Sequence, residues 1–281
     1  MLATAQKLAG LPHVDAVMHY LASPPRKPCL FAGPLEQDGR PDARAHQRCR
    51  ARIHDARPIA DSLSLDHEGF RLVRHASATR SFWSAADLER IYYPEIESLV
   101  ASATGACWAF VLGHTVRRRV YGLPDHTSGA PRQPPMHVHV DFTERSAVRR
   151  LQDVAGLAAR SALRRRFAIV SAWRPIRGPL HDAPLAMCDA TSVAAADLVA
   201  VDVVKPGRIG EFFGVLASPQ HRWMYFPGMR PDELLLFKSY DSAGDGIARF
   251  VPHAAFEDPS APADRLIQES IEVKAVAVFG A

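Results

Sequence analysis

The sequence predicts a mainly β protein, a barrel or sandwich with helices packed on one side. Segments with helical spacing fall almost entirely within the first 166 residues, whereas the rest of the chain reads as strands separated by turns rich in Pro, Gly and Asp. The segment 137–141, which alternates His, Val, His, Val and Asp, also predicts a strand, one that carries metal ligands. We expect a single domain over 1–281, with a helical and meandering N-terminal extension over about residues 1–105.

Two helices are expected. Residues 84–103 carry apolar side chains at intervals of three and four, which is typical of an amphipathic helix. Ser84 is positioned to cap its N-terminus, Pro94 should break or kink it, and Gly105 should end it. The second helix is predicted over 144–166, where one face is strongly basic.

The other elements are predicted from alternation, apolar runs and turn signals. Residues 21–50 mix proline, glycine and charge, which indicates an ordered meander across the surface. A loop with four prolines and two glycines, 122–135, leads directly into the strand that contains His139. Further strands are predicted over 70–75, 107–112, 167–173, 197–204, 222–226, 234–240, 247–251 and 269–279.

The pair His139 and Asp141 offers two metal ligands from one rigid element, because residues i and i+2 of a strand share a face. His253, which follows the predicted strand 247–251, would supply a third ligand from a distant strand. Two histidines and one carboxylate form the facial triad that holds Fe(II) and leaves coordination positions open. His137 shares the face of His139, but no aspartate follows it two residues later, so we interpret it as a pocket residue beside the metal. The alternative for each histidine is a plain core or surface role.

Composition and charge are those of an ordinary soluble globular protein, with 47% hydrophobic and 23% charged residues and a net charge of +4. The basic runs 117–119 and 164–166 are short and lack aromatic stacking partners, so we interpret them as solvated surface arginines and expect no nucleic-acid binding. No apolar stretch reaches the roughly 18 residues of a membrane span. The N-terminal segment carries His13 and Asp15 in its apolar portion, which argues against a secretion signal.

The cysteines show no Cys-x-x-Cys spacing and are expected to be reduced, mostly buried thiols. They are Cys29, Cys49, Cys107 and Cys188. With no export or membrane signal, we expect a cytoplasmic protein.

Short motifs spread over nearly the whole chain carry a family resemblance. They cover residues 55–57, 65–70, 92–95, 104–106, 138–141, 173–176, 184–189, 221–226, 236–242 and 248–253. Taken together, they resemble the bacterial and fungal oxygenases typified by the CmcJ, AsaB and gibberellin desaturase-like proteins. The resemblance implies a double-stranded β-helix, a jelly-roll or cupin-like barrel, that uses Fe(II) and 2-oxoglutarate. It also implies His139, Asp141 and His253 as the iron ligands.

The chain departs from the family pattern at the residue expected to bind 2-oxoglutarate. The family usually ends with Pro-Arg-Glu-Ser-Ile-Glu-Val-Arg, whose first arginine is expected to pair with the distal carboxylate of 2-oxoglutarate. In this chain Gln268 stands at that position, and Arg265 or Lys274 would have to supply the charge. The candidate co-substrate residues are therefore Arg265, Gln268, Ser270 and Lys274, together with the further cations Arg174, Lys238 and Arg249. The alternative for the last three is a structural ion pair, for example with Asp189, Asp241 or Asp245.

The resemblance implies an Fe(II)/2-oxoglutarate-dependent dioxygenase that hydroxylates or desaturates a small molecule, a secondary metabolite or an amino-acid- or lipid-derived compound. Molecular oxygen and that small molecule are the expected partners, a homodimer is expected, and nucleic acid and membranes are not. Two alternatives stay open. One is an iron oxygenase that takes its electrons from the substrate rather than from 2-oxoglutarate, and the other is a non-catalytic accessory binding protein of a biosynthetic pathway.

Overall fold

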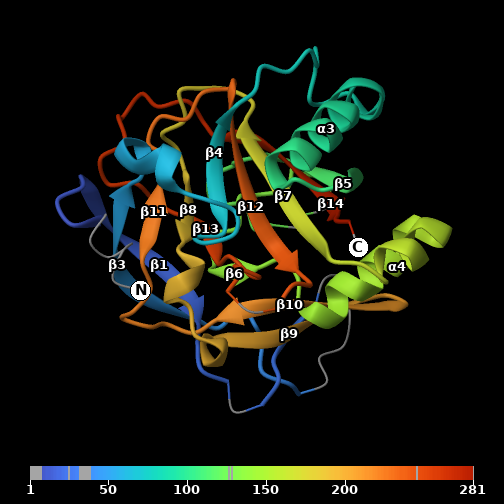
Figure 1. Cartoon of the computed structure of the whole chain (residues 1–281). Helices are drawn as coiled ribbons and strands as arrows, with labels where there is room; N and C mark the ends of the chain where they lie inside the picture. Colours follow the sequence, from blue (N-terminus) through green and yellow to red (C-terminus); the bar gives the residue numbers. More distant parts are fainter. Residues whose placement is uncertain are drawn as a thin grey trace.

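Strands dominate the computed structural model, which describes residues 8–24, 26–31, 39–125, 127, 129–244 and 246–280 (Figure 1). They form two sheets. The smaller sheet is antiparallel throughout and contains, in spatial order, β4 (Phe70–Arg74), β12 (Glu233–Asp241), β7 (Phe167–Pro175), β14 (Glu269–Val278) and β5 (Trp108–Arg118). The larger sheet contains β1 (His13–Leu21), β3 (His46–Asp55), β11 (Trp223–Tyr225), β8 (Leu185–Cys188), β13 (His253–Ala255), β6 (His139–Val140), β10 (Arg208–Val215), β9 (Leu198–Lys205) and β2 (Cys29–Phe31).

The inner faces of the two sheets share one apolar core. Trp173 of β7 and Phe237 of β12 belong to the same buried cluster as Met187 of β8, so side chains of opposite sheets meet between them. This is the jelly-roll arrangement of a double-stranded β-helix, which confirms the predicted fold class.

The first helical segment begins at Ser84, whose Oγ accepts a hydrogen bond from the backbone N–H of Asp87 at 3.2 Å. It ends at Gly105, which adopts a left-handed conformation with φ of 70°. The segment consists of α2 (Ala85–Asp87), the π turn η2 (Leu88–Tyr92) and α3 (Tyr93–Thr104). Pro94 lies in the first turn of α3, where its missing N–H breaks no helical bond. The interruption expected at Pro94 therefore takes the form of a π turn just before it.

Helix α3 covers the outer side of the smaller sheet (Figure 1). Ile96 and Val100 of α3 are buried in one cluster with Ile271 and Val273 of β14. The second predicted helix is α4 (Glu144–Ala162), which ends at Ala162 rather than at residue 166. Single-turn 3-10 helices complete the set: η1 (Arg57–Ser62), η3 (Ala190–Ser192) and η4 (Ala195–Asp197).

The main differences from the sequence prediction lie in the larger sheet. The predicted meander over 21–50 contains β2 and the first half of β3, and β3 pairs with β1 along its length, from His13 opposite His54 to Leu21 opposite His46. Within β3, Cys49, Ala51 and Ile53 alternate with arginines, but only Ile53 is fully buried, and the charged composition of the segment led to the interpretation as a meander. The predicted strand 247–251 is wrong, because regular structure begins only with β13 at His253.

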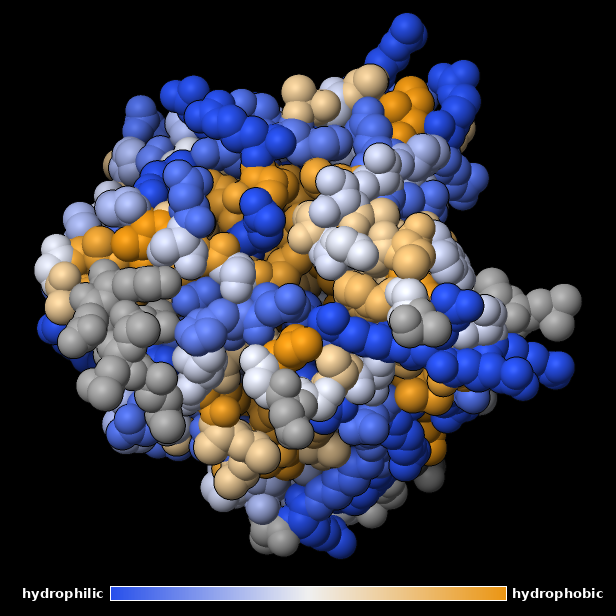
Figure 2. All heavy atoms as spheres, viewed as in Figure 1, coloured by the Kyte–Doolittle hydropathy of each residue, from blue (hydrophilic) through white to orange (hydrophobic). Residues whose placement is uncertain are grey.

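Polar side chains cover most of the face seen in Figure 2, with apolar patches visible between them. Within the described part of the chain, no helix has both the length and the apolar character needed to cross a lipid bilayer. Of the cysteines, Cys29 and Cys188 are buried, Cys49 is half-buried and Cys107 is exposed.

Candidate metal centre

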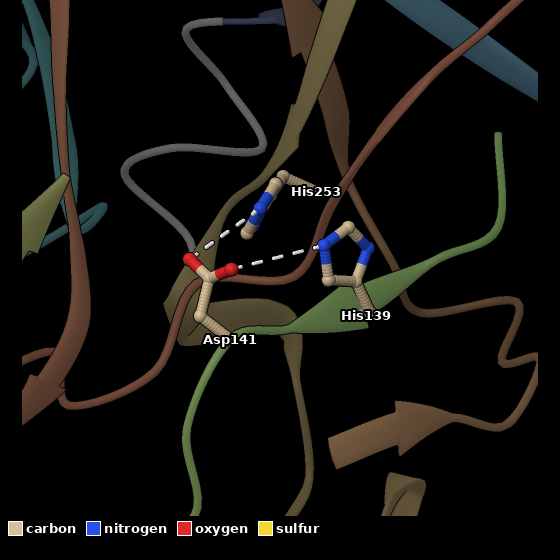
Figure 3. A group of neighbouring side chains, drawn as sticks. All are labelled: His139, Asp141 and His253. Carbon is tan, nitrogen blue, oxygen red and sulfur yellow. Dashed lines mark ion pairs between the residues drawn. The ribbon is translucent and has the colours of Figure 1, made fainter. Parts of the chain in front are cut away.

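The side chains of His139, Asp141 and His253 point toward one another (Figure 3). One ligand atom from each lies within 4.8 Å of the others. Nε2 of His139 is 3.9 Å from Oδ1 of Asp141, and Nε2 of His253 is 3.8 Å from Oδ2. Over the residues that the structure describes, this is the one cluster of at least three His, Cys, Asp or Glu side chains spaced to hold a metal ion.

Sheet register brings these residues together. His139 of β6 is the direct cross-strand partner of His253 of β13, and the two ring centroids are 4.4 Å apart. Opposite residues of an antiparallel pair project to the same face, so both imidazoles face the barrel interior. Asp141 directly follows β6. Because it comes two residues after His139, its side chain projects to the same face.

Backbone carbonyls fix the tautomer of both histidines. Nδ1 of His139 lies 2.9 Å from the carbonyl oxygen of His137, and Nδ1 of His253 lies 3.0 Å from that of Val251. A carbonyl only accepts, so each Nδ1 carries a proton, and each Nε2 is the ring nitrogen that faces Asp141. Burial, together with the neighbouring His253, lowers the pKa of His139 to about 4, so this ring is neutral at physiological pH.

One oxygen of Asp141 is held by the chain itself. Oδ2 accepts a hydrogen bond from Ser239 Oγ at 2.8 Å and lies 2.9 Å from Lys274 Nζ. Burial by itself raises the pKa of Asp141, but the charge of Lys274 and the two imidazoles outweigh burial and hold that pKa well below its usual range. The site therefore presents an ionised carboxylate beside the neutral imidazole of His139.

This donor set fits Fe(II). Two imidazole nitrogens and one carboxylate oxygen on a single face are the ligands of non-haem iron oxygenases, in which open positions remain for other ligands. The contacts to Nδ1 of each histidine and to Oδ2 of Asp141 resemble those that orient metal ligands in proteins. Because the imidazole of His139 is already neutral and the carboxylate of Asp141 ionised, a cation would displace no proton from either on binding.

Lys274 is the one predicted co-substrate residue that touches the triad. Besides Asp141, its Nζ contacts Glu272 in a short ion pair and lies 3.4 Å from Ser171 Oγ. Burial by itself lowers the pKa of Lys274, but the charges of Asp141 and Glu272 raise it above its usual value, so the ammonium stays charged inside the barrel. Lys274 thus helps to orient Asp141 through Oδ2.

Arg117 is a buried cation that the sequence analysis missed. It was interpreted as a solvated surface arginine, but its side chain is only 12% exposed and its Nη2 lies 4.0 Å from Glu272. Arg118, next along β5, points the other way and is 47% exposed. Side chains alternate between the two faces of a strand, so a predicted strand that reached residue 118 would have placed Arg117 and Arg118 on opposite faces. The predicted strand ended at residue 112.

Gln268, directly before β14, and Ser270, within that strand, are both buried. Gln268 Nε2 donates to the carbonyl of Ala183 at 3.2 Å. Among the described residues, neither Oε1 of Gln268 nor Oγ of Ser270 has a hydrogen-bond partner. Arg265 instead lies near the surface, with Nε 3.5 Å from Asp182. The strand thus presents two unsatisfied buried polar atoms, which is unusual in a folded protein and consistent with a ligand.

The other three cations lie away from the triad. Arg174 donates to the backbone carbonyl of His75 at 3.0 Å and stacks on Tyr92 at 5.2 Å, on the helix-covered side of β7. Lys238 forms ion pairs with Asp66 at 2.6 Å and Asp241 at 2.7 Å. Arg249 donates to the carbonyl of Asp241 at 2.9 Å and pairs with Glu144 at 3.1 Å. For Lys238 this is the structural ion pair that the sequence left as the alternative, whereas Asp245 lies outside the described residues.

Two cavities are lined by residues that contact the candidate metal ligands, and neither is lined by a ligand itself. The first, of about 300 Å³, is lined by Val120, Tyr121, Leu123, Gln133, Met136 and His137, among others. The ring of His137 lies 4.9 Å from that of His139, so this cavity reaches the triad through one side chain. The second, of about 240 Å³, is lined by Glu272 and Lys274 together with Phe142, next to Asp141. A larger hollow of about 380 Å³, around Tyr20 and His221, includes no member of the triad.

Comparison with known proteins gives consistent results. The model of the oxidoreductase/YMDC permease-like domain family matches residues 18–279. The chain is 33% identical over 225 residues to the hydroxylase/desaturase efuI of Hormonema carpetanum, covering 73% of this chain and 76% of that protein. It is 32% identical over 239 residues to the Fe(II)/2-oxoglutarate-dependent dioxygenase nvfI of Aspergillus novofumigatus, covering 82% of this chain and 83% of that protein.

A solved structure gives the same result at the level of the fold. The iron and alpha-ketoglutarate-dependent endoperoxidase NvfI superimposes with a TM-score of 0.85 at 28% identity, over 96% of this chain and 99% of that one. The similarity therefore extends over nearly the full length of both chains.

Proposed function

We propose that this chain, which belongs to the oxidoreductase family of Fe(II)- and 2-oxoglutarate-dependent dioxygenases, hydroxylates or desaturates a small molecule of secondary metabolism. In this proposal His139, Asp141 and His253 hold the iron. The observation that carries it is the approach of three ligand atoms to within 4.8 Å of one another, with both Nε2 atoms facing the carboxylate.

Bound Fe(II) would supply oxygen activation, coupled to the oxidative decarboxylation of 2-oxoglutarate to succinate and carbon dioxide. The residues of the chain orient the groups. The carbonyls of His137 and Val251 hold each Nε2 toward the metal position, and Ser239 and Lys274 hold Oδ2 of Asp141. Phe237, whose ring lies 4.6 Å from that of His253, belongs to the apolar core and excludes water on that side.

The cavity beside His137 is the proposed place for the organic substrate. Its volume of about 300 Å³ is at the lower end of small-molecule sites, and its walls combine apolar side chains with Tyr121 and Gln133. His137 would then separate the substrate from His139, with which its ring is in contact.

The test is the stoichiometry of the reaction. Protein reconstituted with Fe(II) should form one succinate for each oxygen molecule consumed when it is supplied with 2-oxoglutarate and a panel of candidate substrates. His139→Ala should form none, while His221→Ala, which changes a histidine remote from the triad, should retain the coupling.

Gln268 favours one second candidate, an iron oxygenase whose substrate supplies the electrons, because no guanidinium stands at the position where the family carries one. Oxygen uptake without succinate would support that candidate and exclude the use of 2-oxoglutarate. Absence of oxygen uptake with every candidate, together with biological activity that survives His139→Ala, would identify an accessory binding protein instead.

The proposal includes a cytoplasmic homodimer. Cell fractionation tests the location, and light scattering on the purified protein tests the oligomeric state.

A further inference from the structure

Arg117 shares the inner face of the smaller sheet with the residues that approach the metal ligands. In the register of β5 with β14, Arg117 lies directly opposite Ser270, so the two side chains project to the same side. Ser270, Glu272 and Lys274 alternate along that same face of β14. Because Lys274 contacts Asp141, this face looks toward the triad. The side chain of Arg117 therefore lies on the inner face of the smaller sheet, with its Nη2 4.0 Å from Glu272.

The two interior cations are engaged to different degrees. Lys274 is bound to both Asp141 and Glu272. Arg117 donates through Nη1 to the carbonyl of Gln133 at 2.8 Å, but its Nη2 lies 4.0 Å from Glu272, which is beyond hydrogen-bond distance. Arg117 therefore retains donor capacity for an anion, whereas Lys274 is already committed to carboxylates of the chain.

Unsatisfied polar atoms lie on the strand next to Arg117. Ser270 Oγ is buried and has no partner in the described part of the structure, although its hydroxyl can donate to an anion. Oε1 of Gln268, two residues earlier on the same side, is unsatisfied as well. A serine hydroxyl beside an under-used guanidinium provides the donors that a carboxylate needs.

The charges of the interior also require an anion once a metal is bound. Asp141 and Glu272 balance Lys274 and Arg117, so the site is neutral when both histidines are neutral. A divalent cation leaves an excess of two positive charges in a low-dielectric interior, where uncompensated charge is costly. A dianion that binds with the metal restores neutrality.

We propose that Arg117, assisted by Ser270, binds the distal carboxylate of 2-oxoglutarate and so selects 2-oxo dicarboxylic acids over 2-oxo acids with a single carboxylate. This rests on the proposed function, and it assigns the charge to Arg117 rather than to Arg265 or Lys274. The planar guanidinium can bind a carboxylate with two parallel hydrogen bonds, which a lysine ammonium cannot do.

The test is a binding titration of anaerobic, Fe(II)-loaded protein. 2-Oxo acids that chelate Fe(II) give a visible charge-transfer absorption, which reports binding without turnover. Arg117→Met should raise the Kd for 2-oxoglutarate at least tenfold, about 1.4 kcal/mol. The Kd for 2-oxopentanoate, which has the same carbon chain without the second carboxylate, should change less than twofold.

Controls separate this role from a structural one. Arg118→Met alters the adjacent arginine, which faces outward and pairs with Glu269 at 3.1 Å, and should leave both Kd values unchanged. Arg117→Lys keeps the positive charge but loses the two parallel hydrogen bonds of the guanidinium, so it should bind 2-oxoglutarate with intermediate affinity. It replaces Arg117→Met in the test if that variant does not fold. In the Arg117→Met background, Gln268→Arg should recover affinity for 2-oxoglutarate.

Two results would overturn the inference alone: wild-type affinity of Arg117→Met for 2-oxoglutarate, or equal weakening of both 2-oxo acids. Wild-type protein that binds Fe(II) but shows no absorption change with 2-oxoglutarate would refute the co-substrate of the proposed function, and the inference with it.

Discussion

At the scale of the residue, the candidate site depends on the contacts that orient each candidate ligand. The carbonyls of His137 and Val251 determine which ring nitrogen of His139 and His253 is available, and Ser239 and Lys274 determine the orientation of Asp141. Such outer contacts typically contribute a factor of about 10–100 in metal affinity.

The first prediction concerns Asp141. Replacement by alanine removes the one anionic ligand, so Asp141→Ala should bind no stoichiometric Fe(II), while its circular dichroism spectrum and cooperative unfolding persist. Iron content after anaerobic loading and desalting measures the effect. Stoichiometric iron in this variant would contradict the assignment of the ligand.

The second prediction concerns Lys274. Lys274→Met removes the cation that contacts Oδ2 of Asp141, and the affinity for Fe(II) should fall by about 10–100-fold. Competition with a chelator of known affinity gives the value. The matched control is Lys205→Met, an exposed lysine at the end of β9, which should bind iron as the wild type does. Equal affinities for the two variants would show that Lys274 does not position the ligand.

At the scale of the element, buried ion pairs and close packing hold the strands that present the ligands. Asp241, at the end of β12, accepts from Arg166 at 2.8 Å, next to the start of β7, and pairs with Lys238 at 2.7 Å. Burial by itself raises the pKa of Asp241, but Arg166 and Lys238 outweigh burial and lower it. Lys238 is thus part of the framework that positions Ser239.

The third prediction follows from that ion pair. A carboxylate whose pKa is lowered by folding contributes stability above its unfolded pKa of about 3.9, and this stability is lost as the pH falls through the lower folded value. Asp241→Asn should therefore lower the free energy of unfolding at neutral pH by about 3 kcal/mol and flatten its decline in acid. Urea unfolding between neutral and acidic pH measures both effects. An acid decline as steep as that of the wild type would contradict this role.

The fourth prediction concerns Gly69, which packs against the segment before His253. Its φ is +88°, and an added Cβ would lie 2.3 Å from Cγ2 of Val251. Gly69→Ala should destabilise the protein by about 2–5 kcal/mol, from backbone strain and overpacking together. It should also weaken iron binding, because the carbonyl of Val251 orients His253.

The control for Gly69 is Gly207→Ala. Gly207 has φ of +69° and no atom within 4 Å of the added Cβ, so this variant should show only the backbone cost of about 1–2 kcal/mol and normal iron binding. Denaturant unfolding and iron titration of the two variants distinguish the effects. Equal destabilisation would show that contact with Val251 is unimportant.

At the scale of the whole molecule, the sequence predicted what short-range patterns encode. Apolar runs identified β7 and β14, and the His-x-Asp spacing predicted that His139 and Asp141, two of the candidate ligands, share one face. By contrast, β3 was missed because its residues near the sheet edge are largely polar and exposed. The sequence analysis did not predict that Arg117 points into the barrel. A shift of one residue in the strand register would exchange the inward and outward positions of Arg117 and Arg118, and the sequence pattern did not determine that register.

The pairing of distant strands lies beyond what local patterns encode. His253 was predicted as a ligand, but its place directly opposite His139 depends on the register of β13 against β6, which forms only when the two sheets close around their core. The candidate site is therefore a property of the closed barrel rather than of any one segment.

An anomalous-difference map of crystals grown anaerobically with Fe(II) tests the central claim most directly. The account predicts one strong iron peak, about 2 Å from Nε2 of His139, Nε2 of His253 and a carboxylate oxygen of Asp141. No peak at that position, or an iron peak bound by other residues, would contradict it.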